Sequence, residues 1–276
     1  MRHLALRYFP ALFLGCLLSS SGLAQQARSF SFAVVPQYDG RTLHSTWQPI
    51  LDYLESTTGY HFVLATSPDI PSFSQRLNNG VFDFAYANPM QFLQASRLQH
   101  YRPVLRDGSR NLQGIVVVRD DSEMQQIEQL RDQPMAFPAP NALGATLLVR
   151  YELDKLHGVS VDPRYVKTHN SAYLQVATGR LPAAGGVVST LLQQPTEVRD
   201  RLRIIYRTEE VSPHPIAAHP RVGAEAIRKF TQAFLALAQT RNGQAWLASI
   251  PLTQPIAAVT TDYRNIETYD LTSFTQ

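Results

Sequence analysis

The fold is indicated first by the run Phe30-Ser31-Phe32-Ala33-Val34-Val35, a β-type stretch that ends at Pro36. Residues 47–54 follow with apolar side chains at helical spacing, and Gly59 is placed to end that helix. Residues 60–65 return to a strand pattern. A strand, a helix and a second strand in this order predict a β-α-β unit, and therefore an α/β fold.

The same alternation of strands and helices continues along the chain. Further strands are predicted at 81–86, 114–119, 135–137, 165–168, 183–188, 203–206 and 216–218, with helices at 71–79, 141–156, 171–178 and 224–239 and one capped by Ser122. Two such α/β units joined by extended segments suggest two lobes with a cleft between them, and a cleft of this kind is the default place for a ligand.

We expect the chain to cross between the lobes near Arg119-Asp120 and again within residues 209–215, which are rich in proline. This gives a discontinuous first lobe of residues 25–118 and 210–276. Residues 119–209 form the second lobe.

The first 24 residues have the pattern of a cleaved secretory signal. Arg2 and Arg7 precede an apolar run at 12–18, and Gly22-Leu23-Ala24 fits the small residues that signal peptidase accepts. The apolar run is shorter than the roughly 20 residues that cross a bilayer. The alternative is lipidation at Cys16, because Gly15-Cys16 is half of a lipobox. Cys16 is the only cysteine, so cleavage after residue 24 leaves no disulfide, thiol nucleophile or cysteine-based metal site.

The charge balance and the motifs exclude several classes of function. Removal of the signal leaves 23 of the 25 Lys and Arg residues against 22 Asp and Glu residues, with no run of basic residues. This near-neutral balance argues against a nucleic-acid partner. The chain has no Gly-x-Ser-x-Gly elbow, P-loop or His-Glu-x-x-His sequence, and its histidines lack metal-site spacing. We therefore predict a protein that is not an enzyme and that uses no cofactor or metal.

Several stretches occur in an order that is fairly specific when they are taken together. They are Phe32–Gln37, Asn79–Tyr86 followed by Pro89, Val104–Gly108, Val116–Ser122, Lys167–Ser171 and His214–Pro220. In this order they resemble the phosphate/phosphite/phosphonate-type substrate-binding proteins of ABC transporters. The resemblance implies a type II periplasmic binding protein with two doubly wound lobes. It also implies a periplasmic location, capture of a small anionic ligand in the cleft, and an inner-membrane ABC permease as the partner.

The resemblance further implies which residues bind the ligand. The anion would be held by Tyr86 on the first lobe and, on the second, by His169 and a helix N-terminus comprising Asn141, Ala142, Leu143 and Gly144. Tyr38 is a further candidate. A helix N-terminus suits this role because its first N–H groups have no partner within the helix.

One departure from the family pattern leaves the ligand open. Family members that bind phosphonates open this helix with serines and threonines, whereas here Thr146 is the only nearby hydroxyl. The same fold also serves an alternative function, a periplasmic sensing module that reports ligand occupancy to a membrane kinase or cyclase.

Several of these residues also have simpler structural interpretations. Tyr86 would then close the core at a strand end, and Asn141 would cap its helix. His214 and His219 are interpreted as structural, and Asn88 as the cap of a helix that begins at Pro89.

Overall fold

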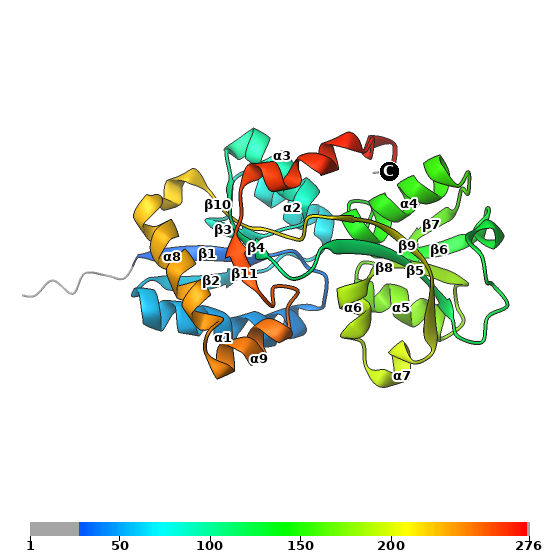
Figure 1. The fold of residues 1–276 in the computed structure, drawn as a ribbon, viewed down its shortest axis with the longest axis horizontal. Coiled ribbons are helices and arrows are strands. Elements are labelled where there is room, and N and C mark those ends of the chain that lie inside the picture. The colour runs from blue at the N-terminus through cyan, green and yellow to red at the C-terminus, as the bar shows by residue number, and fades with distance from the viewer. Residues whose placement is uncertain (1–27, 275–276) are drawn as a thin grey trace, which may run out of the picture.

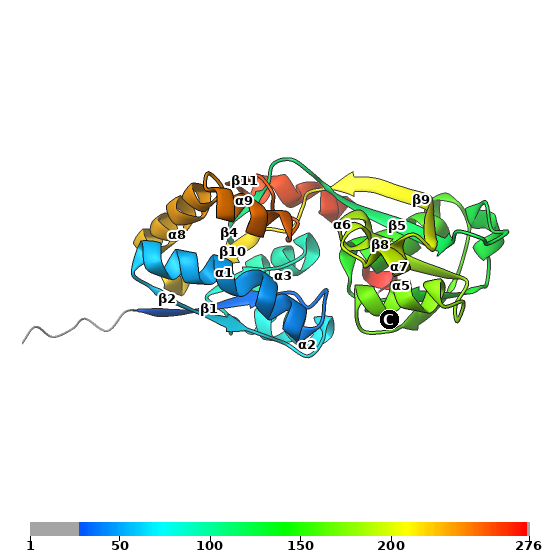
Figure 2. The same ribbon diagram turned by 90° about the horizontal axis from the view of Figure 1, so that it is seen from below.

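The computed structural model describes residues 28–274 as two lobes, each built around one β-sheet (Figure 1, Figure 2). The predicted signal segment 1–24 and Cys16 lie outside the described residues. Within residues 28–274, no helix has the length and apolar character needed to cross a bilayer.

The first lobe contains a six-stranded sheet in the order β11-β4-β10-β3-β1-β2. Its strands are β1 (Ser29–Val34), β2 (His61–Ala65), β3 (Phe84–Tyr86), β4 (Arg102–Asp107), β10 (Ile216–Ala218) and β11 (Pro255–Ala257). Strands β2, β1 and β3 are parallel, whereas β10 runs antiparallel to β3 and β4. Its helices are α1 (Gly40–Thr58), α2 (Ile70–Asn78), α3 (Pro89–Gln99), α8 (Ala224–Leu237) and α9 (Arg241–Ala248). Helices α1 and α9 pack together on one side of the sheet and α2 and α3 on the other (Figure 1).

Local sequence explains why the first β-α-β unit forms as predicted. The side chain of Asp39 accepts hydrogen bonds from the N–H groups of Arg41 and Thr42 and so caps α1. Gly59 ends the helix with φ 72°, a left-handed conformation that glycine adopts without steric cost. The apolar positions of α1 that were read from the sequence are buried against the sheet. The α/β prediction is confirmed for this unit.

The second lobe contains a five-stranded sheet in the order β7-β6-β8-β5-β9. Its strands are β5 (Leu112–Arg119), β6 (Pro134–Phe137), β7 (Asp162–Tyr165), β8 (Ala183–Val187) and β9 (Leu202–Val211). One continuous helix at 143–156 consists of η2 (Leu143–Leu148), α4 (Val149–Tyr151) and η3 (Glu152–Leu156), and both of its ends are π-helical. The other α-helices are α5 (His169–Ala177), α6 (Val188–Leu192) and α7 (Thr196–Arg199).

The long antiparallel pair β5 and β9 carries the chain into the second lobe and back. We predicted the lobe boundary at 118/119, which is the far end of β5. Strand β5 instead pairs along its whole length with β8 and β9. The connections between the two sheets are therefore residues 108–111 and 212–215. The helix predicted after Ser122 is reduced to a 3₁₀ turn, η1 (Ile127–Leu130).

Apolar packing joins the two lobes. The largest core cluster combines the aromatic residues of the first lobe, where the rings of Phe84 and Phe230 stack at 4.3 Å, with Leu112, Leu143 and Val187 of the second. A 3₁₀ turn, η4 (Pro220–Val222), precedes α8, and two further 3₁₀ segments, η5 (Thr260–Thr268) and η6 (Thr272–Phe274), follow β11. The last two run from the first lobe toward α4 (Figure 1).

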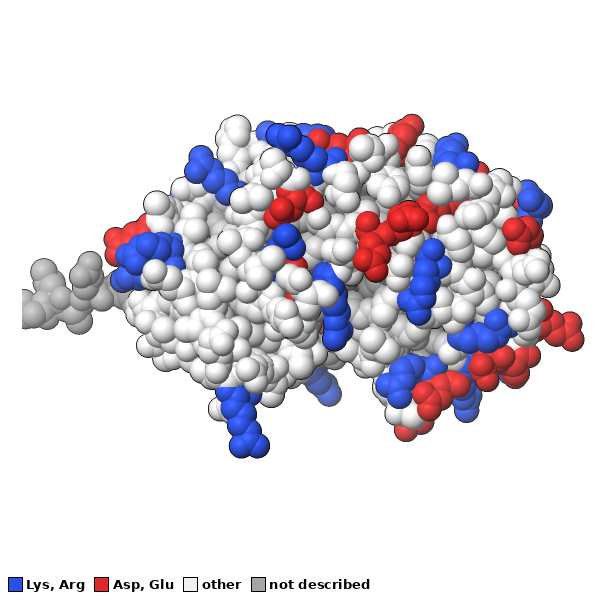
Figure 3. Space-filling model, viewed as in Figure 1, with Lys and Arg blue, Asp and Glu red and all other residues white. Residues whose placement is uncertain are grey.

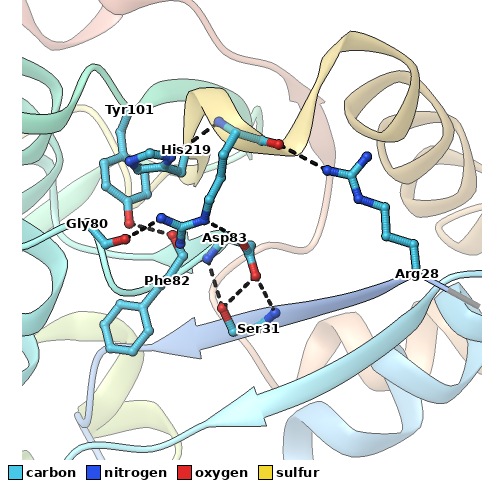
Figure 4. A network of polar contacts seen from close by, with 8 residues as sticks. Arg28, Ser31, Gly80, Phe82, Asp83, Tyr101 and His219 are labelled. Carbon is cyan, nitrogen blue, oxygen red and sulfur yellow. Dashed lines mark hydrogen bonds and ion pairs between the residues drawn. The ribbon is translucent and has the colours of Figure 1, made fainter.

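A polar network holds the N-terminal strand of the first lobe in place (Figure 4). The carboxylate of Asp83 accepts hydrogen bonds from the Ser31 N–H at 2.8 Å and from its hydroxyl at 2.9 Å. Arg221 donates to the other oxygen of Asp83 at 2.6 Å, and Arg28 donates to the Arg221 carbonyl. Burial acts to raise the pKa of Asp83, but the bonds from Ser31 and Arg221 outweigh it and hold the pKa below its ordinary value.

Candidate functional site

The facing sides of the lobes enclose a cavity of about 350 Å³, within the range of small-molecule sites. Gln37 and Tyr86 line it from the first lobe, Val187 and Ser189 from the second, and His214 from the connection between β9 and β10. Two much smaller voids of about 10 Å³ adjoin it through shared lining residues. The cavity therefore lies between the lobes, where the sequence placed the ligand.

Tyr86 ends β3 with its side chain 1% exposed. Its ring packs 5.1 Å from Trp47 and stacks on His214 at 5.3 Å, as the structural interpretation required. Its hydroxyl nevertheless lacks a hydrogen-bond partner among the described residues, and Tyr86 lines the cavity. Burial, with nearby Tyr38 and Asp107, raises the pKa of Tyr86, so the phenol stays protonated and able to donate.

Two buried histidines meet beside this tyrosine. His169 is the first residue of α5, and its Nδ1 lies 3.2 Å from the hydroxyl of Thr190. Burial lowers the pKa of His169 to about 4. Burial, together with the neighbouring His169, lowers the pKa of His214 to about 3. Both histidines are therefore neutral near pH 7, and each can donate one ring N–H.

His214 is the residue that the sequence analysis missed as part of the site. It was interpreted as structural, yet it lines both the large cavity and the smaller void that contains His169. The available signal was its position in the proline-rich connection between the lobes. His219, by contrast, packs edge-on against Tyr101 at 5.0 Å and accepts a hydrogen bond from the Arg221 N–H.

The start of the helix at 143–156 lines the smaller void through Ala142, Leu143 and Gly144. A Cβ at Gly144 would lie 2.6 Å from Val187, so only glycine allows the helix to approach this closely. The carbonyl of Ala142 accepts from the N–H groups of both Thr146 and Leu147, which starts the helix in its π-helical form.

Asn141 neither caps this helix nor lines the void. The helix has Ala142 at its N-cap and no side-chain cap. The amide of Asn141 instead donates to Ser74 of α2 at 2.8 Å, and its carbonyl accepts from Asn88 at 3.3 Å. Asn141 thus joins the two lobes. The cap predicted at Asn88 is confirmed, because Asn88 and Gln91 form a reciprocal capping box at the start of α3.

Tyr38 lies beside the cavity in the second small void, together with Gln37 and Tyr86. Its hydroxyl donates to the side-chain oxygen of Gln193 in the second lobe. The Gln193 amide in turn donates to the carbonyl of Ser249 in the first lobe at 2.8 Å. Tyr38 therefore contributes to a bridge between the lobes rather than to the wall of the large cavity.

The charged residues at the cavity differ in their partners. Asp107 is 2% exposed, and its carboxylate accepts hydrogen bonds from Ser109, Thr253 and Gln254. Arg110 and Arg207 are exposed and also line the cavity, and neither takes part in an ion pair within residues 28–274. Arg207 donates a hydrogen bond to the side-chain oxygen of Gln113 at 3.2 Å. The exposed carboxylate of Glu210, which accepts from Asn111 at 3.1 Å, also lines the cavity, so groups of both charges reach it.

Charged side chains of both signs are interspersed with broad neutral areas on the face drawn in Figure 3. This face has no continuous basic surface of the kind that binds nucleic acid. Among residues 28–274, no group of three or more His, Asp or Glu side chains is arranged to hold a metal ion.

The model of the family described as ABC transporter, phosphonate, periplasmic substrate-binding protein matches residues 32–263. The chain belongs to this family. Its members bind small ligands and work with membrane permeases, and the expected solute-binding function is confirmed at that level. The comparisons do not favour the alternative of a sensing module.

Solved structures with the same fold include a binding protein component of an ABC phosphonate transporter from Pseudomonas aeruginosa. It is 17% identical, with a TM-score of 0.78 over 87% of this chain and 85% of that one. PhnD1 from Prochlorococcus marinus, in complex with methylphosphonate, is 15% identical, with a TM-score of 0.77 over 87% and 96%. XAC2383 from Xanthomonas citri, bound to chloride ion, is 17% identical, with a TM-score of 0.71 over 90% and 97%. These likenesses confirm the type II periplasmic binding protein fold.

Proposed function

We propose that this protein is exported to the periplasm with removal of residues 1–24 and captures a small organic anion for an ABC permease. The ligand class is a phosphonate or a similar oxyanion with an organic substituent, held in the 350 Å³ cavity. The observation that carries the proposal is Tyr86, which lines this cavity and whose buried hydroxyl has no hydrogen-bond partner in the described chain. A buried polar group of this kind is costly unless something binds to it.

Several groups around the cavity can donate hydrogen bonds to a ligand. The Tyr86 phenol, the neutral His214 ring, the Gln37 amide and the Ser189 hydroxyl can all donate. Arg110 and Arg207 add positive charge. Of the two carboxylates at the cavity, Asp107 is already hydrogen-bonded to Ser109 and Thr253, and Glu210 accepts a hydrogen bond from Asn111. Two guanidinium groups that form no ion pair within residues 28–274, together with these neutral donors, can hold an anion.

Both lobes supply these donors, so a bound ligand interacts with the closed arrangement more strongly than with an open one. Such a ligand shifts the population toward closure by its difference in affinity for the two states. This is the behaviour required of a protein that presents a loaded, closed form to a permease.

The test is the substitution Tyr86→Phe, with the dissociation constant of methylphosphonate measured by isothermal titration calorimetry. Loss of one hydrogen bond to a charged ligand is expected to weaken binding by about tenfold or more. Tyr101→Phe is the matched control, because Tyr101 is equally buried in the first lobe but donates to the Phe82 carbonyl and does not line the cavity. Equal affinities for the wild type and Tyr86→Phe would contradict the proposed role of Tyr86.

A further inference from the structure

Two apolar side chains, Leu112 and Val187, cover the start of the helix at 143–156. Each lines both the 350 Å³ cavity and the smaller void that contains Ala142–Gly144. A Cβ added to Gly144 would lie 2.6 Å from Cγ1 of Val187 and 3.1 Å from Cδ1 of Leu112, so both side chains contact the helix start. They therefore lie between the first turn of this helix and the large cavity.

Little room remains at the helix start. The void there measures about 10 Å³, which is no more than the space for one water molecule. The first N–H groups of a helix have no partner within the helix and attract anions. The wall of this void is mixed, with Leu112 and Val187 beside polar residues such as His169 and His214. Its size leaves no space for an oxyanion, so a compact oxyanion that enters the large cavity does not reach the helix start.

The two covering side chains are held by the second sheet. Leu112 begins β5 and pairs with Val211 of β9. Val187 ends β8, and its carbonyl and N–H are both hydrogen-bonded to the hydroxyl of Tyr173, at 2.9 and 3.0 Å. Leu112 and Val187 are only 7% and 2% exposed. The sheet therefore fixes both backbones, and both side chains are buried next to Gly144.

We propose that Leu112 and Val187 are specificity-determining residues of the ligand site. They exclude inorganic phosphate from the helix start and present an apolar surface to the organic substituent of the ligand. Val188, Pro213 and Pro251 extend the apolar part of the same cavity. This inference rests on the proposed function only in taking the ligand to be a substituted oxyanion.

The experiment compares inorganic phosphate with butylphosphonate as probes, by calorimetry, on the wild-type chain, Leu112→Ala and Val187→Ala. Shortening either side chain opens the helix start, so inorganic phosphate is expected to bind about tenfold or more tightly than to the wild type, the gain from one charge-assisted hydrogen bond. Leu191→Ala is the matched control, since Leu191 is 6% exposed in the same lobe and lines none of these spaces. Its affinity for phosphate is expected to equal that of the wild type.

Circular dichroism and a cooperative thermal transition establish that each variant is folded. If Leu112→Ala does not fold, the smaller truncation Val187→Ala decides the question. Folded variants whose phosphate affinity equals that of the wild type and Leu191→Ala overturn the proposal. Failure of the wild type to bind butylphosphonate contradicts the proposed function instead. A gain of phosphate binding in Leu112→Ala supports the role of Leu112 in either case.

Discussion

Acidification is expected to destabilise this protein through the two buried histidines of the site. The folded-state pKa of His169 is about 4 and that of His214 is about 3, against an ordinary value near 6.5. Both are depressed because burial disfavours the charged ring. The unfolded chain therefore takes up protons below pH 6.5 that the folded chain does not, so stability is present above pH 6.5 and is lost as the pH falls toward 4 and 3.

The size of this loss follows from proton linkage. At pH 5 each unfolded histidine is almost fully protonated while each buried one remains neutral. The unfolded state then gains about 2 kcal/mol per histidine relative to pH 8, or about 4 kcal/mol for both. That is a large fraction of the 5–15 kcal/mol by which domains are typically stable.

The assay is urea denaturation followed by circular dichroism at pH 8 and pH 5. The wild type should lose about 4 kcal/mol between the two conditions, and His169→Gln and His214→Gln about 2 kcal/mol each. Any destabilisation common to both pH values cancels in the difference. His44→Gln, at an exposed position of α1, is the control and should lose as much as the wild type. If the histidine variants show the full wild-type loss, the buried histidines are not its origin.

Two further predictions use matched pairs of residues. Gln193→Ala removes a bridge between the lobes, so methylphosphonate should bind about three- to tenfold more weakly by calorimetry. Gln194→Ala breaks hydrogen bonds only within the second lobe, so it should lower the melting temperature and leave the affinity for methylphosphonate unchanged. Equal affinities of the Gln193 and Gln194 variants would contradict a role for the Gln193 bridge in ligand binding. Asp83→Asn loses charge-assisted bonds and should cost about 1.5–3 kcal/mol in urea denaturation. Asp121→Asn is the control, because the ion pair of Asp121 with Arg119 is exposed and its loss should change the free energy of unfolding little. Equal losses of stability in Asp83→Asn and Asp121→Asn would contradict a stabilising role for the polar network around Asp83.

Local patterns were sufficient for the elements whose stabilising contacts lie close together along the chain. The apolar spacing of α1 and the glycine at its end predicted both the helix and its last residue. The Asn88-Pro89 pair predicted the start of α3, because the capping bonds involve residues only three positions apart. The helix predicted after Ser122 was wrong, because only the 3₁₀ turn Ile127–Leu130 forms there. The segment has some apolar spacing, but most of it does not form a helix.

The sequence by itself determined the α/β class and the family. Of the residues it predicted to bind the ligand, Tyr86 lines the large cavity, whereas Ala142, Leu143, Gly144 and His169 line the adjoining void. Only the tertiary structure decided that β5 belongs to the second sheet, that Asn141 contacts Ser74 rather than capping its helix, and that His214 lines the cavity. It also placed Leu112 against Gly144. Each of these facts depends on contacts between segments far apart in sequence, and the local periodicity of a segment does not specify which distant side chain packs against it.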